Sequence, residues 1–258
     1  MILCISPAKN LDFESRRIQV KATQPAMLDA SALLIERLKQ MSAAEVRKLM
    51  GLSDSLARLN ARRYAEWKLP FSAENARPCI FAFAGDVYRG LDAASLNARD
   101  LDYAQKHLRI LSGLHGLLRP LDLIQPYRLE MGTKLAVNGS RDLYAYWGDR
   151  IARALNEAMH AARSRVLVNL ASEEYFKAVG ADRIEGEVIQ PVFKDLKNGK
   201  YSVFFVYAKR ARGMMCRYAI EQRATDPEQL KGFDLGGYRY APKLSAEREW
   251  VFTRDTPA

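Results

Sequence analysis

The segment LRILSGLHGLLRPLDLIQPYRLEMG, residues 108–132, constrains the fold more than any other part of the chain. Gly113 and Gly116 stand three residues apart, and a leucine follows each of them. Glycine adopts positive φ and lets another backbone approach closely, so this spacing favours a tight hairpin between two helices. We expect a helix-hairpin-helix element at about residues 99–125.

Such a hairpin offers a way to bind an anion. Its second helix would begin with free N–H groups and a partial positive charge, which suits a phosphate. Arg109 and Arg119 flank the hairpin, and His115 lies inside it, where a ring nitrogen could meet a phosphate. The alternative is an ordinary helix C-cap followed by a turn, with His115 facing water. Pro126 restricts any second helix to about two turns.

The charge of the chain favours an anionic partner. It has 258 residues with 40 Lys and Arg against 30 Asp and Glu, a net charge of +10 and an isoelectric point near 9.5. This balance is typical of proteins that bind nucleic acid or phosphorylated ligands, although a merely basic soluble protein would share it. No apolar run of about 18 residues is present, and three widely spaced cysteines suit a reducing compartment. We expect a cytoplasmic protein without membrane contact.

Apolar periodicity divides the chain into interspersed strands and helices. We expect strands at residues 1–6, 78–83, 165–170, 187–196 and 200–207, and two weaker ones within 236–253. We expect helices at residues 26–48, 53–67, 97–110, 141–162 and 208–221. Because no regular β-α-β period and no linker appears, the sequence predicts an α/β (mixed α+β) fold in a single compact domain spanning 1–258.

A basic helix is expected near the C-terminal end. Eight basic residues lie within 194–223, opposed by only two acidic ones. At about 100° per residue, Lys209, Arg212 and Arg217 share a broad face, and Arg210 points elsewhere. This helix is predicted to bind DNA phosphates together with the hairpin, and the alternative is a solvated helix face.

Polar clusters follow three predicted strands. If these strand ends converge, they form a cleft that contains Lys9, Asp86, Tyr88, Asn169, Ser172, Glu174 and Tyr175. A lysine beside carboxylates can perform general acid–base or Schiff-base chemistry once it is desolvated. The catalytic candidates are therefore Lys9, Asp86, Asn169, Ser172 and Glu174. Capping and turn formation are the alternative roles, since Ser172 and Asp86 both suit an N-cap.

Established catalytic and metal motifs are missing from the sequence. It contains no phosphate-binding lysine loop, no G-x-S-x-G, no H-E-x-x-H and no dinucleotide glycine fingerprint. The three histidines and three cysteines have no metal-ligand spacing, so we expect neither a metal site nor a cofactor. Direct iron binding would need carboxylates assembled from distant segments.

Seven motifs in one order extend over nearly the whole chain. They are SPAKNLD, FAGDVYRGL, the segment 108–132, LYAYWGD, NLASEEYFK, PVFKDLKNGK and YAKRARGMM. Together they resemble the peroxide stress resistance protein YaaA family. The resemblance implies a bacterial cytoplasmic protein of hydrogen peroxide defence that limits iron-dependent damage. It also implies an unusual α/β fold with a helix-hairpin-helix, whose glycines would be Gly113 and Gly116, and a positively charged cleft that binds DNA. His115 stands where this family usually has an aromatic residue.

Two functional hypotheses follow. In the first, the chain binds DNA without reading its sequence, and its contacts are Arg109, Gly113, His115, Gly116, Arg119, Lys209, Arg210, Arg212 and Arg217. In the second, it is an enzyme that acts on a nucleotide, a nucleobase or damaged DNA in the cleft of Lys9, Asp86, Asn169 and Glu174.

Overall fold

The computed structural model describes residues 1–15 and 18–255. The strands are β1 (Ile2–Ile5), β2 (Asn10–Leu11), β3 (Arg77–Pro78), β4 (Phe83–Ala84), β5 (Leu108–Ser112), β6 (Gly116–Leu118), β7 (Leu123–Ile124), β8 (Val166–Leu170), β9 (Glu187–Lys197), β10 (Lys200–Ser202), β11 (Arg239–Tyr240) and β12 (Glu249–Arg254). The α-helices are α1 (Leu28–Lys39), α2 (Ala43–Met50), α3 (Asp54–Glu66), α4 (Cys79–Ala82), α5 (Asp86–Leu91), α6 (Ala98–His107), α7 (Leu143–Trp147), α8 (Arg150–Ala161), α9 (Glu173–Phe176) and α10 (Phe205–Gln222). Short 3₁₀ helices are η1 (Ala93–Ser95), η2 (Ala181–Arg183), η3 (Pro227–Gly232), η4 (Leu235–Gly237) and η5 (Pro242–Leu244).

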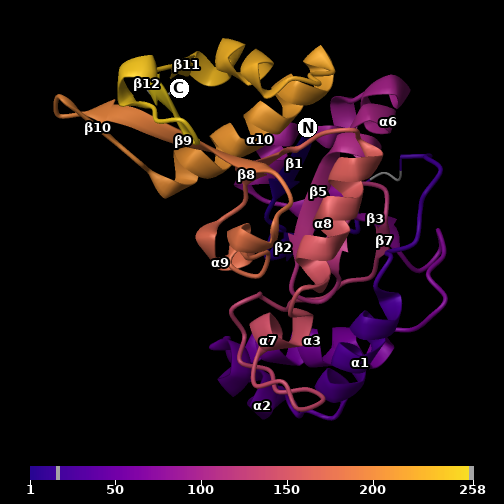
Figure 1. Cartoon of the computed structure of the whole chain (residues 1–258). Helices are drawn as coiled ribbons and strands as arrows, with labels where there is room; N and C mark the ends of the chain where they lie inside the picture. Colours follow the sequence, from indigo (N-terminus) through magenta and orange to yellow (C-terminus); the bar gives the residue numbers. More distant parts are fainter. Residues whose placement is uncertain (16–17, 256–258) are drawn as a thin grey trace.

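One mixed sheet runs through the described residues. Its strand order is β11-β12-β9-β8-β1-β5-β6, and β10 pairs with β9. Strands β12, β9, β8, β1 and β5 run parallel, whereas β11, β10 and β6 pair antiparallel at its margins. Helices α1, α2, α3 and α7 gather at one end of the molecule, and α10 lies with the C-terminal strands at the other (Figure 1). The α/β fold with a mixed sheet in a single domain is confirmed.

Strand β1 lies at the centre of the sheet because its sequence is apolar on both faces. Every residue from Met1 to Ile5 is at most 2% exposed. Parallel strands covered on both faces read as continuous apolar runs, and ILCI is such a run. The register places Ile5 beside Leu170 of β8 and Ile110 of β5. The segments that follow β1 and β8 therefore leave the sheet side by side.

Several predicted elements are confirmed and others need correction. The predicted strand over 200–207 is too long, because β10 ends at Ser202 and helix α10 begins at Phe205. The predicted helices over 26–48 and 53–67 appear as α1, α2 and α3, and Ser53 caps α3 by accepting a hydrogen bond from Leu56 N. The predicted strand over 78–83 is wrong, because Cys79 N and Ile80 N donate to carbonyls of the 120–122 loop and form the short helix α4 instead. The predicted helix over 141–162 is divided into α7 and α8 at Gly148, whose φ is +56°.

The helix-hairpin-helix prediction is wrong for this chain. Helix α6 ends at His107, and the next residues form strand β5, parallel to β1. After the tight turn the chain returns as β6, antiparallel to β5, so the glycines close a β-hairpin. Gly116 has φ +68°, as its glycine identity predicts. The pattern of the short apolar run LRIL fits a helix and a strand equally well, and its pairing with β1 makes it a strand.

Helices α5 and α10 cross with their backbones in contact. A Cβ added at Gly213 would lie 1.8 Å from the Val87 carbonyl oxygen, and one added at Gly90 would lie 2.1 Å from the Arg210 carbonyl oxygen. Only glycine permits this approach at either position. The crossing fixes the first turn of α5 against the basic face of α10.

Candidate functional site

A cavity of about 380 Å³ opens beyond the carboxyl ends of β1 and β8. In open α/β sheets this edge is the usual place for a ligand. Ser6, which follows β1, accepts a hydrogen bond from Ser172 N at 2.8 Å, and this bond joins the two strand ends. The lining residues are Ser6, Pro7, Ala8, Lys9, Asn10, Ala84, Gly85, Asp86, Val87, Tyr88, Tyr127, Arg128, Leu129, Glu130, Leu170, Ser172, Glu174, Tyr175, Lys209 and Arg212.

The predicted convergence of polar strand ends is confirmed for most of the cluster. Lys9, Asp86, Ser172 and Glu174 all line the cavity, as do the two predicted tyrosines. Asn169 does not line it. Its side chain is buried, and Oδ1 accepts a hydrogen bond from Ala171 N at 3.0 Å, so this residue shapes the turn after β8. The catalytic roles of the cleft residues stay predictions.

An ion-pair network lies at the mouth of the cavity. Lys9 Nζ is 2.7 Å from Glu130 Oε2, and Arg128 Nη2 is 2.9 Å from Glu130 Oε1. Burial alone would raise the pKa of Glu130, but the hydrogen bonds from Lys9 and Arg128 outweigh it and hold this pKa below its ordinary value. Glu130 is therefore a carboxylate at neutral pH, and Lys9 stays within reach of any ligand because its side chain is 62% exposed.

The sequence analysis missed Arg128 and Glu130. A signal was present, since these two polar residues alternate with the buried Leu129 and Met131. Such alternation is typical of an extended segment with one buried face and one solvent-exposed face. The predicted second helix of the hairpin concealed it.

Helix α10 contributes two cations to the same cavity. Lys209 and Arg212 line it, and burial lowers the pKa of Arg212. Arg210 is exposed and points elsewhere, as its helical position predicts. Arg217 is tied into the protein, since it donates to Asp92 O at 3.0 Å and pairs with Glu221 Oε1 at 2.9 Å. The sequence treated the basic helix and the strand-end cleft as two sites, and the structure joins them.

The tyrosines give the cavity an aromatic wall. Tyr88 donates a hydrogen bond to Ser6 O at 3.1 Å, and burial raises the pKa of both Tyr88 and Tyr175 well above the usual value. These phenols therefore stay neutral and line the cavity with flat rings. Cations at the mouth and neutral rings inside suit an anionic ligand that carries a flat group.

The glycine hairpin is buried, which corrects its predicted contact with phosphate. Gly113, His115 and Gly116 have no exposed surface to offer, and Trp147 Nε1 donates to Gly113 O at 3.0 Å. His115 Nδ1 lies 3.0 Å from Ser31 Oγ, and its Nε2 has no partner among the described residues. Burial lowers the pKa of His115 to about 3. The histidine is thus a neutral core residue and does not face water.

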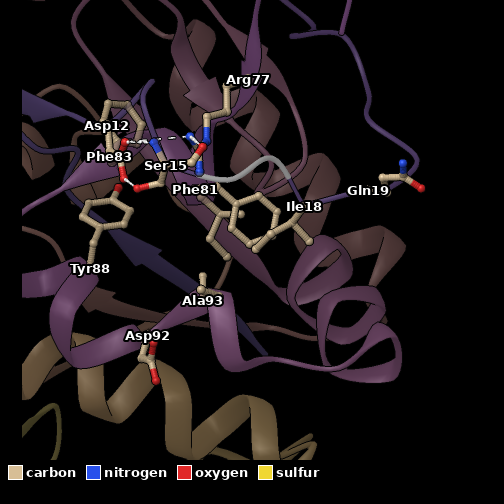
Figure 2. Close-up of a pocket in the computed structure, with 12 residues that line it drawn as sticks. Asp12, Ser15, Ile18, Gln19, Arg77, Phe81, Phe83, Tyr88, Asp92 and Ala93 are labelled. Carbon is tan, nitrogen blue, oxygen red and sulfur yellow. Dashed lines mark hydrogen bonds and ion pairs between the residues drawn. The ribbon is translucent and has the colours of Figure 1, made fainter.

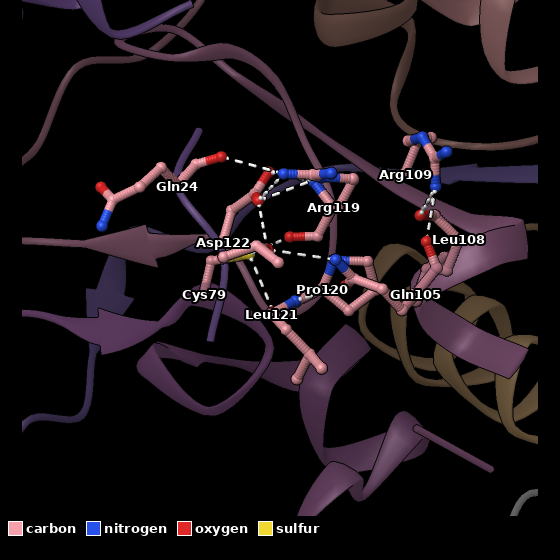
Figure 3. A network of polar contacts seen from close by, with 10 residues as sticks. Gln24, Cys79, Gln105, Leu108, Arg109, Arg119, Pro120, Leu121 and Asp122 are labelled. Carbon is pink, nitrogen blue, oxygen red and sulfur yellow. Dashed lines mark hydrogen bonds and ion pairs between the residues drawn. The ribbon is translucent and has the colours of Figure 1, made fainter. Parts of the chain in front are cut away.

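The two arginines that flank the hairpin are engaged with the protein itself (Figure 3). Arg119 forms an ion pair with the buried Asp122 at 2.8 Å and donates to Gln24 O at 2.9 Å. Arg109 donates to the carbonyl oxygens of Leu108 and Gln105, and burial lowers its pKa. Arg119 therefore joins two loops, and Arg109 caps the end of α6 where the chain enters β5.

A second cavity, of about 790 Å³, lies beside the first (Figure 2). Its wall includes Arg77, Phe81 and Phe83, and Tyr88 borders both cavities. Arg77 donates to Ser15 O at 3.0 Å, while hydrogen bonds from Ser15 lower the pKa of Asp12. No sequence pattern had indicated this space.

The described residues contain neither a candidate metal-binding cluster nor a candidate membrane-spanning helix. Within 1–15 and 18–255, no group of three His, Cys, Asp or Glu side chains could hold a metal ion. Burial raises the pKa values of the thiols of Cys4, Cys79 and Cys216, which are all free. Over the same residues, no helix has the length and apolarity that a membrane crossing demands.

Comparison with known proteins places the chain among bacterial relatives. A family model described as "Peroxide stress protein YaaA" matches residues 1–244. A UPF0246 protein of Dechloromonas aromatica (strain RCB) is 54% identical over 254 residues, which cover 98% of this chain and 99% of that protein. A UPF0246 protein of Tolumonas auensis is also 54% identical over 254 residues, covering 98% of each chain.

Proposed function

The chain belongs to the peroxide stress protein YaaA family, and we propose that it acts in the peroxide stress response by binding DNA in the cavity beyond β1 and β8. One observation carries this proposal: cations from three distant segments, Lys9, Arg128 and the pair Lys209 and Arg212, converge on a single cavity. A net charge of +10 adds long-range attraction for a polyanion. Phosphate contacts of this kind position DNA without reading its sequence.

Binding at this place connects the fold to peroxide defence. Hydrogen peroxide harms DNA when iron reduces the peroxide to hydroxyl radical. This radical reacts close to the place where it forms. A protein bound along the backbone would exclude iron and peroxide from the DNA that it covers, or would mark distorted DNA. Either outcome limits iron-dependent damage without a metal site of the protein's own.

Reversing the charge of Lys209 and Arg212 together tests the DNA site. We expect K209E/R212E to weaken binding to duplex, bubble and junction oligonucleotides alike. Each phosphate contact contributes about 0.7–0.9 to the slope of log affinity against log salt, so the slope should become shallower by about 1.4–1.8. Fluorescence anisotropy at several salt concentrations measures both effects.

The matched control reverses the charge of two exposed arginines that do not line the cavity. Arg62 in α3 and Arg153 in α8 are about two-thirds exposed, and R62E/R153E changes the net charge by the same amount. It should bind DNA far better than K209E/R212E. Equal loss in the two variants would show that net charge alone attracts DNA and would remove the cavity from the proposal.

The second candidate function is an enzyme that acts on a nucleotide, a nucleobase or damaged DNA in the same cavity. The observation that favours it is the ion-paired Lys9, an exposed amine 2.7 Å from the Glu130 carboxylate. Such a pair can transfer a proton or, after losing one, present a nucleophilic amine. Asp86 and Glu174 would supply further carboxylates, whereas Asn169 lies outside the cavity.

Lys9→Arg separates the two functions, because it keeps the positive charge but not the amine. If the chain only binds DNA, K9R should keep wild-type affinity and full peroxide protection in cells. If Lys9 acts chemically, K9R should keep DNA affinity and lose protection. Peroxide survival assays paired with anisotropy measure both. Retained protection by K9R would argue against amine chemistry.

A further inference from the structure

The first turn of α10 exposes a phenylalanine to solvent. Phe205 is 80% exposed and Val206 is 63% exposed, the two highest values among the large apolar residues of the described chain. Burying a phenyl ring is favourable, so a ring presented in this way is costly to leave in water and is available to a partner.

Two aromatic side chains close to Phe205 in the sequence are held by the protein, but the ring of Phe205 is free. Lys197 Nζ lies 5.4 Å from the centre of the Phe204 ring, and Arg254 lies 5.1 Å from that of Tyr207. Phe204 and Tyr207 also contact each other, with ring centres 6.2 Å apart. Within the described residues Phe205 takes part in no aromatic or cation–π contact. Its backbone is thus fixed on both sides while its ring faces outward.

The position of Phe205 on the helix aligns it with the cations of the cavity. Lys209 follows it by four residues and Arg212 by seven, so at about 100° per residue the three span about 60° around the helix axis. A rise of 1.5 Å per residue places Phe205 about 6 Å along the axis from Lys209 and about 10 Å from Arg212. Because Lys209 and Arg212 line the cavity, Phe205 lies just outside it on the same face.

We propose that Phe205 is a stacking platform for an unpaired DNA base, with the neighbouring phosphates bound by Lys209 and Arg212. The proposal rests on DNA binding in the cavity and names the form of DNA that fits there. A flat ring beside a line of cations is the arrangement by which proteins bind single strands, because every base has a π-face. A cavity of about 380 Å³ has room for one small-molecule-sized group, such as a single nucleotide with its base unpaired.

The size and charge of this surface favour DNA over other partners. Phe205 and its exposed apolar neighbours Val203, Val206 and Tyr207 are only four side chains, whereas a stable protein interface buries about 1,200–2,000 Å². A second copy of this basic chain would also bring like charges together. Exposed Lys197, Lys200, Lys209 and Arg210 lie on or near the start of α10, and they complement a polyanion.

The test compares F205A with wild type on a single strand, a bubble and a fully paired duplex of equal length. Stacking contributes enough that F205A should bind the single strand and the bubble about 5- to 150-fold more weakly. Its affinity for the paired duplex should stay at the wild-type value. V206A, which removes the adjacent exposed apolar side chain from a different face of α10, should match wild type on all three. Because both residues are exposed, circular dichroism should show an unchanged fold.

F205W adds a direct signal of stacking. It should restore the affinity that F205A loses, and single-stranded DNA should quench the emission of the added, exposed tryptophan, because the three native tryptophans are buried. If wild type binds no DNA, both the proposed function and this inference fail. If wild type binds DNA but F205A binds every substrate equally well, DNA binding stands and the stacking role is overturned. If F205A loses binding to anionic vesicles but keeps its DNA affinity, Phe205 contacts a membrane surface, and the stacking role is likewise overturned.

Discussion

Replacing Arg254 by methionine is expected to lower the free energy of unfolding by about 3–5 kcal/mol, because it leaves a carboxylate buried without its cation. Asp195 is fully buried, and Arg254 Nε donates to its Oδ1 at 2.6 Å. Tyr238 donates to the same carboxylate at 3.1 Å, and the Arg254 guanidinium lies over its ring. Tyr238 alone cannot replace the lost charge. Urea unfolding followed by circular dichroism measures the effect.

Two controls make this prediction specific. The double variant D195L/R254M removes both charges and should recover much of the lost stability, since the buried charge without a partner dominates the cost. Arg153 pairs with Asp149 in water, and R153M should cost less than about 1 kcal/mol. Equal stability of R254M and R153M would contradict the assigned role. R254M should also loosen Tyr207 at the start of α10, since Arg254 lies 5.1 Å from the centre of that ring.

Acid is expected to destabilise the protein through His115. The folded-state pKa of this histidine is lowered to about 3 by burial, whereas an unfolded chain has its ordinary value near 6.5. Above pH 6.5 this histidine is neutral in both the folded and the unfolded state, so it does not lower the free energy of unfolding there. As the pH falls from about 6.5 toward 3, the unfolded state binds a proton that the folded state does not. Stability should therefore decrease by about 1.4 kcal/mol per pH unit.

His115→Phe removes this titration and keeps an aromatic ring beside Tyr127, whose ring centre is 5.3 Å from that of His115. Urea unfolding at pH 7.5, 5.5 and 4.5 should show a steeper loss for wild type than for H115F. His160 has an exposed side chain near Glu185, so H160Q should follow the wild-type profile. Parallel pH profiles of H115F and wild type would show that His115 does not control the acid response.

The sequence predicted the parts of the fold that depend on local signals. The apolar run before Ser6, the cap at Ser53 and the Asn198-Gly199 dipeptide between β9 and β10 each specify their element through nearby residues. Asn198 and Gly199 both have positive φ, as the type I′ turn favoured by this dipeptide requires. The strand ends of the cleft were also predicted together, because residues that follow parallel strands share one edge of a sheet.

The rest could not be predicted, because distant contacts decide it. Residues 108–112 pair with β1, more than a hundred positions earlier in the chain, and this pairing turns an apolar segment into a strand. Distant residues also bury the turn that had seemed to be a phosphate site, since Trp147 contacts Gly113 and Ser31 contacts His115. Lys209 joins the cleft of Lys9 through the packing of α10 on α5, and helical periodicity says only that it shares a face with Arg212. Local patterns identify surfaces, and the contacts between elements decide which surfaces meet.

The close approach of α5 and α10 at Gly90 and Gly213 has a consequence for how the cleft can change. Because the helices touch through main-chain atoms, the spacing between the backbones of α5 and α10 does not depend on side-chain size at this crossing. Substitutions at Asp86 or Lys209, which line the cavity, can therefore change its charge and hydrogen bonding without moving the two helices apart. The crossing thus keeps the two helices in place, and the ligand preference of the cavity can change through single substitutions of the residues that line it.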